Sequence, residues 1–226
     1  MLTKKDILRL KNTGWVKKNI GEKNKDELLE IGCLLGAPIP SRNGGDVVDE
    51  LIPVSEMEAV SCSLSSIHGK NEFPLHTDTA YMKIPVRFII LYVKNPGSGD
   101  RPTFLVDGYK LVDKLQDDLK LSIYKIKNGR HSFLGNIVEK VDETILVRFD
   151  EGCMSPATRD SCKIKKKFSS FLKDEPKMKI NWRQGDILII DNWRVLHGRG
   201  NSIKNDNNRL LYRLSISRGI KDGNKL

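Results

Sequence analysis

The stretch "WRQGDILIIDNWRVLHGRG", residues 182–200, decides more about this chain than any other segment. Its apolar run over residues 187–190 follows a Gly-Asp turn signal, which predicts a buried strand. Residues 191–193 are expected to turn the chain out of this strand and to aim His197, just past the strand end, where a pocket rim would lie. A histidine in that place can bind a metal if the fold brings further ligands to it.

Short β-type runs surround this stretch from about residue 45 onwards. Few helical patterns separate them, which favours an antiparallel sandwich or barrel over alternating β-α-β units. Helices are predicted at residues 4–11 and 24–35, and a helical insertion is predicted near residues 155–173. The predicted strands are "DVVDELIPV" (46–54), "AVSCSLSS" (59–66), "VRFIILYV" (86–93), "TFLVDG" (103–108), "TILVRF" (144–149), "DILIID" (186–191) and "RLLYRLSIS" (209–217).

The length of 226 residues suits one domain, residues 1–226, with a core of ordinary size. Hydrophobic residues make up 38% and charged residues 30%, the balance of a globular protein. No apolar run approaches the ~18 residues that span a bilayer, and the first residues carry no apolar leader. We therefore expect a cytosolic (cytoplasmic) protein with no membrane partner. The four cysteines are scattered and are expected to stay reduced.

The net charge of +10 comes in large part from "KIKKKFSSFLKDEPKMK", residues 163–179. Lysines alternate there with apolar residues, as on a helix with one buried face. Two interpretations stay open, a solvated lysine face or a surface that attracts an anionic substrate or partner. The alternative function is a basic nucleic-acid-binding β protein without iron, which would need aromatic side chains on a basic strand face. Aromatic residues make up only 7% of the chain, so a nucleic-acid partner is not expected.

A second part of a metal site is indicated in "FPLHTDTAYMKIPVRFIILYV", residues 73–93. His76 precedes Asp78 by two positions, next to a long apolar strand candidate. Such a pair alone is common by chance. Together with the distant His197, it can supply three ligands on one face of an octahedron and leave the other positions open for substrate and oxygen. That arrangement is the facial triad of non-haem Fe(II) oxygenases.

These blocks together resemble the taurine dioxygenase/clavaminate synthase-like superfamily of Fe(II)/2-oxoglutarate oxygenases. Its members carry an HxD or HxE pair, a threonine on a later strand, a W-x-x-GD-(apolar)-DN-x-x-x-x-H block and two arginines four apart. The corresponding stretches here are "LHTDTA", "GDRPTFLVDG", residues 182–197 and "NNRLLYRLSIS". The resemblance runs from about residue 72 to 217. It implies a mainly β fold with flanking helices around a double-stranded β-helix (jelly-roll) core.

The resemblance also implies a role for each matched residue. His76, Asp78 and His197 would bind Fe(II) as the catalytic centre, with 2-oxoglutarate and O2 as cosubstrates. Thr103 and Arg209 match positions that hold the distal carboxylate of 2-oxoglutarate, and a bidentate Arg–carboxylate contact would orient it. The implied reaction couples decarboxylation to succinate with hydroxylation of an unactivated C–H bond. Asp78 favours hydroxylation over halogenation, because halogenating relatives lack this carboxylate.

Arg213 matches the second arginine of the family, which reaches the acidic group of the substrate or helps to hold the cosubstrate. Its even spacing from Arg209 predicts that both guanidinium groups face one side of a strand. Because no acidic residue is assigned to neutralise it, a buried Arg213 predicts an anionic small-molecule substrate. The "LHTDTAY" stretch is more similar to the amino-acid-oxidising branch, so we expect hydroxylation of an amino acid or amino-acid derivative at an aliphatic carbon. Tyr81, His68 and a "SCSLSS" strand are expected to line the pocket.

Two features depart from the family pattern. His76 and His197 are 121 residues apart (197 − 76), fewer than in many relatives, which predicts a reduced segment over the substrate. The polar stretch over residues 198–208 predicts a loop one or two residues longer than expected. Two related readings are not supported. A cupin-type site would need a His-x-His pair and a glutamate in its first motif, and the Arg-x-Asn…Arg signature of nucleic-acid demethylases is absent.

Overall fold

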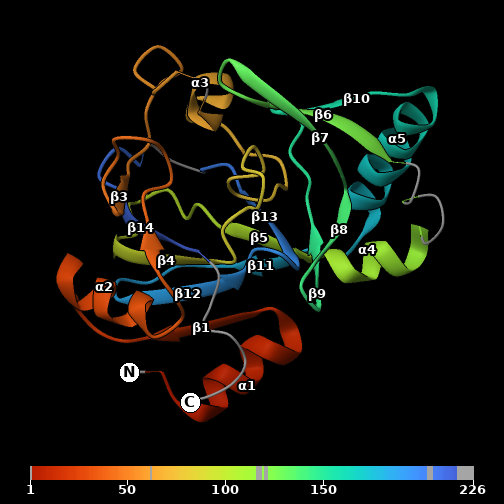
Figure 1. Cartoon of the computed structure of the whole chain (residues 1–226). Coiled ribbons are helices and arrows are strands. Elements are labelled where there is room, and N and C mark those ends of the chain that lie inside the picture. The colour runs from red at the N-terminus through yellow and green to blue at the C-terminus, as the bar shows by residue number, and fades with distance from the viewer. Residues whose placement is uncertain (1, 62, 116–118, 120–121, 203–205, 218–226) are drawn as a thin grey trace.

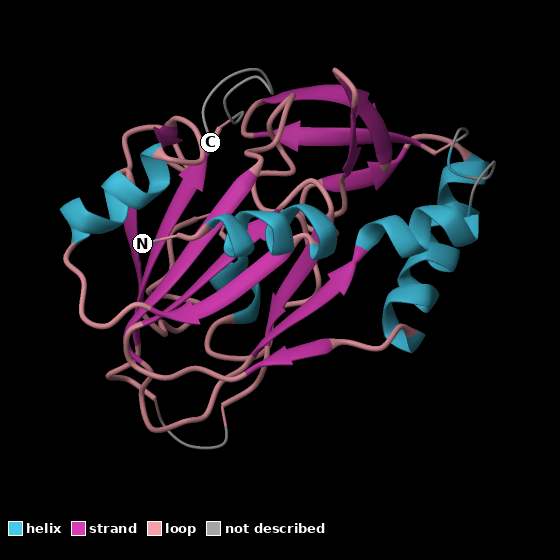
Figure 2. Ribbon diagram, turned by 90° about the horizontal axis from the view of Figure 1, so that it is seen from below, coloured by secondary structure: helices cyan, strands magenta, loops and turns pink. Residues whose placement is uncertain are grey.

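The computed structural model describes residues 2–61, 63–115, 119, 122–202 and 206–217 (Figure 1). Antiparallel strands make up most of its regular structure, and helices cover their edges and outer faces (Figure 2). The mainly β prediction is therefore confirmed. No helix among the residues described is long and apolar enough to cross a membrane. Cys33, Cys153 and Cys162 are free thiols, and Cys62 lies outside the described residues.

The larger sheet has six antiparallel strands in the order β1–β12–β4–β14–β2, and β3 also pairs with β14 (Figure 1). Its central strands are buried on both faces, which explains their continuous apolar sequences. Ile90 and Ile189 pack on the face that α1 and α2 cover, whereas Ile89 and Leu188 lie on the opposite, inner side. The strands are β1 (Trp15–Asn19), β2 (Pro38–Ile39), β3 (Val48–Leu51), β4 (Phe88–Asn95), β12 (Asp186–Asp191) and β14 (Leu210–Ile216).

A second antiparallel sheet packs on that inner face. It has the order β11–β5–β13, formed by β11 (Met178–Ile180), β5 (Thr103–Asp107) and β13 (Val195–Arg199). Leu105 and Val195 from this sheet share a buried cluster with Leu188 and Ile190 from the large sheet. The cluster fixes β13 against the large sheet, and β13 carries His197.

Helices α4 and α5 and the remaining strands form a second core, which Val106 of β5 and Leu196 of β13 join from the β11–β5–β13 sheet. Its main cluster includes Tyr124, Ile126, Phe149 and Phe168. One antiparallel sheet there has the order β10–β6–β7, and β8 pairs with β9. These elements are α4 (Gly108–Leu115), β6 (Ile123–Asn128), β7 (His131–Asn136), β8 (Val138–Val141), β9 (Thr144–Val147), β10 (Met154–Pro156) and α5 (Arg159–Asp174).

Helix α5 confirms the helix predicted near residues 155–173. The Thr158 side chain accepts a hydrogen bond from the backbone N–H of Ser161 and so caps its first turn. Ile164, Phe168 and Leu172 form its buried face, at the spacing of successive turns. Most of its lysines lie on the exposed side. The possible role of that face in binding an anionic partner stays a prediction.

Helices α1 (Lys4–Thr13) and α2 (Lys25–Cys33) confirm the two predicted N-terminal helices, and each begins with a capping box. The strand predicted at residues 59–66 is wrong. Residues 64–68 form a short helix instead, α3 (Leu64–His68), because the Ser63 side chain accepts a hydrogen bond from the N–H of Ser66 and caps a helical turn. The prediction that a "SCSLSS" strand lines the pocket is therefore also wrong.

Candidate metal centre

The backbones of His76 and His197 form a two-way antiparallel bridge. The N–H of His76 donates to the carbonyl of His197 at 2.9 Å, and the N–H of His197 donates to the carbonyl of His76 at 3.0 Å. Residues paired in this way carry their side chains on the same side of the ladder. The two imidazole rings accordingly lie 4.6 Å apart, centroid to centroid. His197 lies inside β13 and not past a strand end, because the turn after β12 leads directly into another strand.

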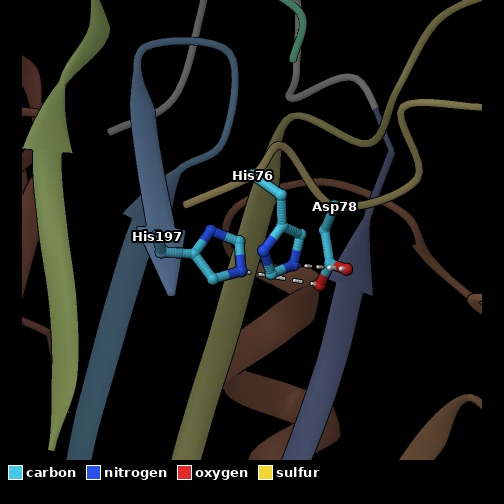
Figure 3. A group of neighbouring side chains, drawn as sticks. All are labelled: His76, Asp78 and His197. Atoms are coloured by element: carbon cyan, nitrogen blue, oxygen red, sulfur yellow. Dashed lines mark ion pairs between the residues drawn. The ribbon is translucent and has the colours of Figure 1, made fainter. Parts of the chain in front are cut away.

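Asp78 completes the group from the same segment as His76 (Figure 3). One carboxylate oxygen lies 3.8 Å from Nε2 of His76, and the other lies 3.9 Å from Nε2 of His197. One ligand atom from each residue falls within 4.8 Å of the other two. Nδ1 of His76 lies 2.9 Å from the carbonyl oxygen of Pro74, which leaves Nε2 directed at the carboxylate. The three residues singled out from the sequence are thus brought together.

The charges of this group favour a bound cation. Burial and the neighbouring His76 lower the pKa of His197 to about 3, so this imidazole is neutral. Burial opposes ionisation of Asp78, but Arg213 and the two histidines outweigh it and hold the pKa of Asp78 below its usual range. Burial also opposes the charged form of His76, yet the hydrogen bond with Asp78 prevails and raises the pKa of His76. A metal that binds here therefore competes with protons for His76.

Asn192 holds the backbone around Asp78. Its side-chain oxygen accepts from the N–H of Asp78 at 2.9 Å, and its amide nitrogen donates to the carbonyls of Asp78 and Val86 at 3.0 and 2.8 Å. The sequence predicts that residues 191–193 aim His197. The side chain of Asn192 positions the other end of the metal group instead.

Arg148 supports the same loop from the opposite direction, and the sequence analysis missed it. It is fully buried and donates to the carbonyls of Ala80, Met82 and Lys83 at 2.5, 2.6 and 2.8 Å. Its guanidinium also lies 3.2 Å from the carboxylate of Glu139. The turn that follows Asp78 is therefore held on both sides. No local sequence signal could have revealed this, since the carbonyl partners are 65 or more residues away.

Arg213 has carboxylate partners within the chain. Its guanidinium lies 2.9 Å from the carboxylate of Asp49 and 3.2 Å from that of Asp78, and it also donates to the hydroxyl of Ser41 at 3.1 Å. The premise that no acidic residue neutralises Arg213 is therefore wrong. The sequence did not reveal this partner, because Asp49 lies on β3, far away in sequence but directly opposite Arg213 in the sheet. The argument for an anionic substrate cannot rest on an unpaired Arg213.

Arg209 lies in a different environment from Arg213. The register of β14 against β4 shifts between Leu210 and Leu211, so the period-two argument for a common face does not hold across this point. Arg209 is buried, and its Nε has no hydrogen-bond partner in the described part of the chain. Burial and the nearby Arg101 lower the pKa of Arg209 to about 10.

Arg209 and two further arginines, Arg101 and Arg199, lie near the carboxylate of Asp206. Arg101 is buried and forms an ion pair with Asp206 at 2.8 Å. Burial, with Arg101 and Arg209 close by, lowers the pKa of Arg199 to about 9. Thr103 is buried opposite Arg199 in the β5–β13 pair, and its hydroxyl accepts from Nε1 of Trp182 at 3.1 Å. The cluster therefore holds more buried positive charge than Asp206 can balance.

Tyr81 is linked to the surroundings of Arg213, whereas His68 contacts Phe73. The hydroxyl of Tyr81 donates to the carbonyl of Ser41, the residue whose hydroxyl also contacts Arg213. His68 is half-buried at the end of α3, with its ring 5.8 Å from that of Phe73. The fourth histidine, His131, is exposed on β7.

Comparisons with known proteins agree with this geometry. Residues 157–215, which contain His197, Arg209 and Arg213, match the family described as taurine catabolism dioxygenase TauD, TfdA family. No curated protein matches the chain by sequence.

The similar solved structures cover nearly the whole chain. Asparagine oxygenase in complex with Fe(II), 2S,3S-3-hydroxyasparagine and succinate has a TM-score of 0.74 and 14% identity, over 94% of this chain and 78% of that chain. The non-heme iron oxygenase OrfP in complex with Fe and alpha-ketoglutaric acid has a TM-score of 0.73 and 20% identity, over 96% and 81%. OrfP with Fe, succinate and (3S)-hydroxy-L-Arg has a TM-score of 0.71 and 20% identity, over 94% and 78%.

The family match covers α5 and the block that follows it, and the fold and the clustered His76, Asp78 and His197 agree with it. The chain therefore has the fold of these non-haem iron oxygenases, and its residues 157–215 match the TauD, TfdA family.

Proposed function

We propose that this chain is an Fe(II)- and 2-oxoglutarate-dependent dioxygenase that hydroxylates an aliphatic carbon of a small amino-acid-type substrate. The observation that carries the proposal is the cluster of His76, Asp78 and His197, with its three ligand atoms within 4.8 Å of one another. Two imidazoles and one carboxylate form the donor set that suits non-haem Fe(II) and leaves coordination positions open.

The residues present fit a metal ion at this point. Both imidazoles turn Nε2 toward the carboxylate of Asp78, and Nδ1 of His76 faces the carbonyl of Pro74. A second partner of this kind on a metal-binding histidine fixes the ring and its tautomer. When bound, iron together with 2-oxoglutarate and O2 supplies the oxidising chemistry. The chain contributes the ligand geometry, the orientation of the bound molecules and a site that excludes water.

Arg209 and Thr103 are the proposed contacts for 2-oxoglutarate. Within the described residues, the buried guanidinium of Arg209 has an Nε without a partner and lies near two further arginines and one aspartate, a setting that an anion stabilises. The distal carboxylate of 2-oxoglutarate supplies that charge, and the hydroxyl of Thr103 lies beside the same cluster. The neighbour OrfP, which shares the fold, is a structure with Fe and alpha-ketoglutaric acid.

An amino acid or amino-acid derivative is the proposed substrate class. The structure of asparagine oxygenase contains 3-hydroxyasparagine, and that of OrfP contains (3S)-hydroxy-L-Arg. These two ligands support an amino-acid substrate over a sulfonate. Tyr81 and His68 are the proposed pocket-lining residues, because Tyr81 lies in the loop that follows Asp78 and His68 precedes the segment that carries His76 and Asp78. Asp78 keeps the third ligand position filled by protein, which favours hydroxylation over halogenation.

The finer points of the fold are proposed on the same basis. We infer that the six-stranded sheet and the β11–β5–β13 sheet form the double-stranded β-helix of the taurine dioxygenase-like superfamily. We also infer that residues 1–226 are one domain and that α5 is an insertion into it. A cytosolic location stays a prediction from the sequence.

Substrate-stimulated succinate release tests the proposed function. The protein with Fe(II), 2-oxoglutarate and O2 is screened against free amino acids, sulfonates and nucleotides, with His197→Ala as the inactive control. We expect stimulation by one or a few amino acids and a product heavier by one oxygen atom. Stimulation by sulfonates alone would contradict the amino-acid class, and succinate release that is equal in His197→Ala would contradict the metal centre.

A further inference from the structure

The donors of Arg213 are occupied by the protein itself. Nε and Nη2 donate to one carboxylate oxygen of Asp49 at 3.3 and 2.9 Å, and Nη2 also donates to the hydroxyl of Ser41 at 3.1 Å. Nη1 donates to both oxygens of Asp78, at 3.4 and 3.2 Å. All three nitrogens of the guanidinium are therefore hydrogen-bonded within the chain, and two carboxylates balance its charge.

Asp49 is built into the sheet for this contact. It is 7% exposed and lies directly opposite Arg213 in the β3–β14 pair, so both side chains leave the same face. The hydroxyl of Ser41 donates to the same oxygen of Asp49 at 2.7 Å. A buried aspartate between a hydroxyl and a guanidinium has a fixed direction, and it fixes the direction of the guanidinium in turn.

We propose that Asp49 is a positioning residue for the metal centre: it holds Arg213 against the carboxylate of Asp78 and thereby occupies the arginine that would otherwise receive an acidic group of the substrate. The inference rests on the proposed function, since it assumes that Asp78 is a metal ligand. An acidic group of the substrate then finds its partner at a residue other than Arg213.

The negative charge of Asp49 explains why its loss should weaken metal binding at Asp78. With Asp49 present, Arg213 shares its hydrogen bonds between two carboxylates, and Asp78 keeps lone pairs directed at the histidines. Without the negative charge of Asp49, Arg213 has Asp78 as its single carboxylate partner and competes with a metal for the same oxygens. Residues that orient a metal ligand in this way change metal affinity by about 10- to 100-fold.

The test is a titration with Co(II) under anaerobic conditions, followed by visible absorption, which reports the geometry of the ligands without turnover. Asp49→Asn is expected to weaken Co(II) binding at least about tenfold and to change the absorption bands. Asp49→Glu, which keeps the charge, is expected to recover part of the affinity. Ser41→Ala removes the hydroxyl that bonds both Asp49 and Arg213 without altering a charge, and we expect the same spectral change with a smaller loss of affinity.

The matched control is Glu50→Gln. Glu50 is the next residue of β3, is exposed and forms an ion pair with Lys25 at 2.7 Å, so its loss removes an equal charge away from the site. It is expected to bind Co(II) like the wild type. Asp49→Asn is also made in an Arg213→Met background, where its effect should largely vanish because the connecting residue is gone.

Two results would overturn the inference. One is wild-type affinity and spectrum in both Asp49→Asn and Ser41→Ala. The other is an effect of Asp49→Asn that is just as large with Arg213→Met, which would make Asp49 only a nearby negative charge. A wild-type chain that binds no Co(II) would count against the proposed metal centre itself, and so the two failures are distinguishable.

Discussion

Arg209 is the residue whose surroundings most clearly require an anion. Its guanidinium is buried, its Nε has no hydrogen-bond partner among the residues that the structure describes, and Arg101 and Arg199 add positive charge nearby. The sequence predicts Arg209 and Thr103 through the resemblance, but Arg101, Arg199 and Asp206 carried no local signal. Their grouping depends on loops that meet only in the folded chain, because Asp206 pairs with a residue 105 positions away.

Replacement of Arg209 should weaken the use of 2-oxoglutarate. Loss of a charge-assisted contact in a buried site costs about 2–3 kcal/mol, so Arg209→Ala should raise the 2-oxoglutarate concentration needed for half-maximal succinate release by roughly 30-fold or more. Arg183→Ala, at an exposed arginine, is the control. A normal 2-oxoglutarate requirement in Arg209→Ala would assign the carboxylate to another residue.

The same contrast between motif and tertiary contact applies at the metal centre. His76, Asp78 and His197 could be predicted because their spacing matches a known pattern. Asp49 could not, because its contact with Arg213 follows from the pairing of β3 with β14. Because Asp49 neutralises Arg213, an unpaired Arg213 no longer predicts an anionic substrate.

At the scale of elements, β4 and β12 were predictable because their burial is continuous. β4 and β12 are covered on both faces, so their apolar runs are unbroken. β6 and β13 were missed because lysines interrupt the first, and His197 and two polar or small residues interrupt the second. Residues 203–205 of the loop predicted over 198–208 lie outside the described residues, and the start of that stretch belongs to β13.

The turn between β12 and β13 connects the two parts of the metal centre. Asn192 in this turn makes three hydrogen bonds to the backbone of residues 78–86, so its loss leaves buried polar groups unpaired. Asn192→Ala should lower the free energy of unfolding by about 2–3 kcal/mol and weaken Fe(II) binding about tenfold. Denaturant unfolding and Fe(II) titration measure the two effects. Asn207→Ala, at an exposed site, should change neither.

A result that separated the two effects would be informative. If Asn192→Ala lost stability but bound Fe(II) with wild-type affinity, the Asp78 loop would keep its geometry without this turn. The positioning role would then belong to Arg148, which holds the same loop from its other side.

At the scale of the whole molecule, two sheets and a loop meet at one point. His197 comes from the β11–β5–β13 sheet, while Arg213 comes from the large sheet, and the segment of His76 and Asp78 bridges to β13 before it enters β4. A metal bound there ties together segments that are 121 residues apart (197 − 76). The arrangement accounts for the burial of the two histidines and the partial burial of Asp78, which would otherwise be unfavourable.

The central claim is that this meeting point binds one Fe(II). Anaerobic titration of the wild-type chain with Fe(II) should saturate at one equivalent. His197→Ala should lose tight binding, whereas His131→Ala, at the exposed histidine of β7, should keep it. Unchanged Fe(II) affinity in His197→Ala, or no binding by the wild type, would contradict the account.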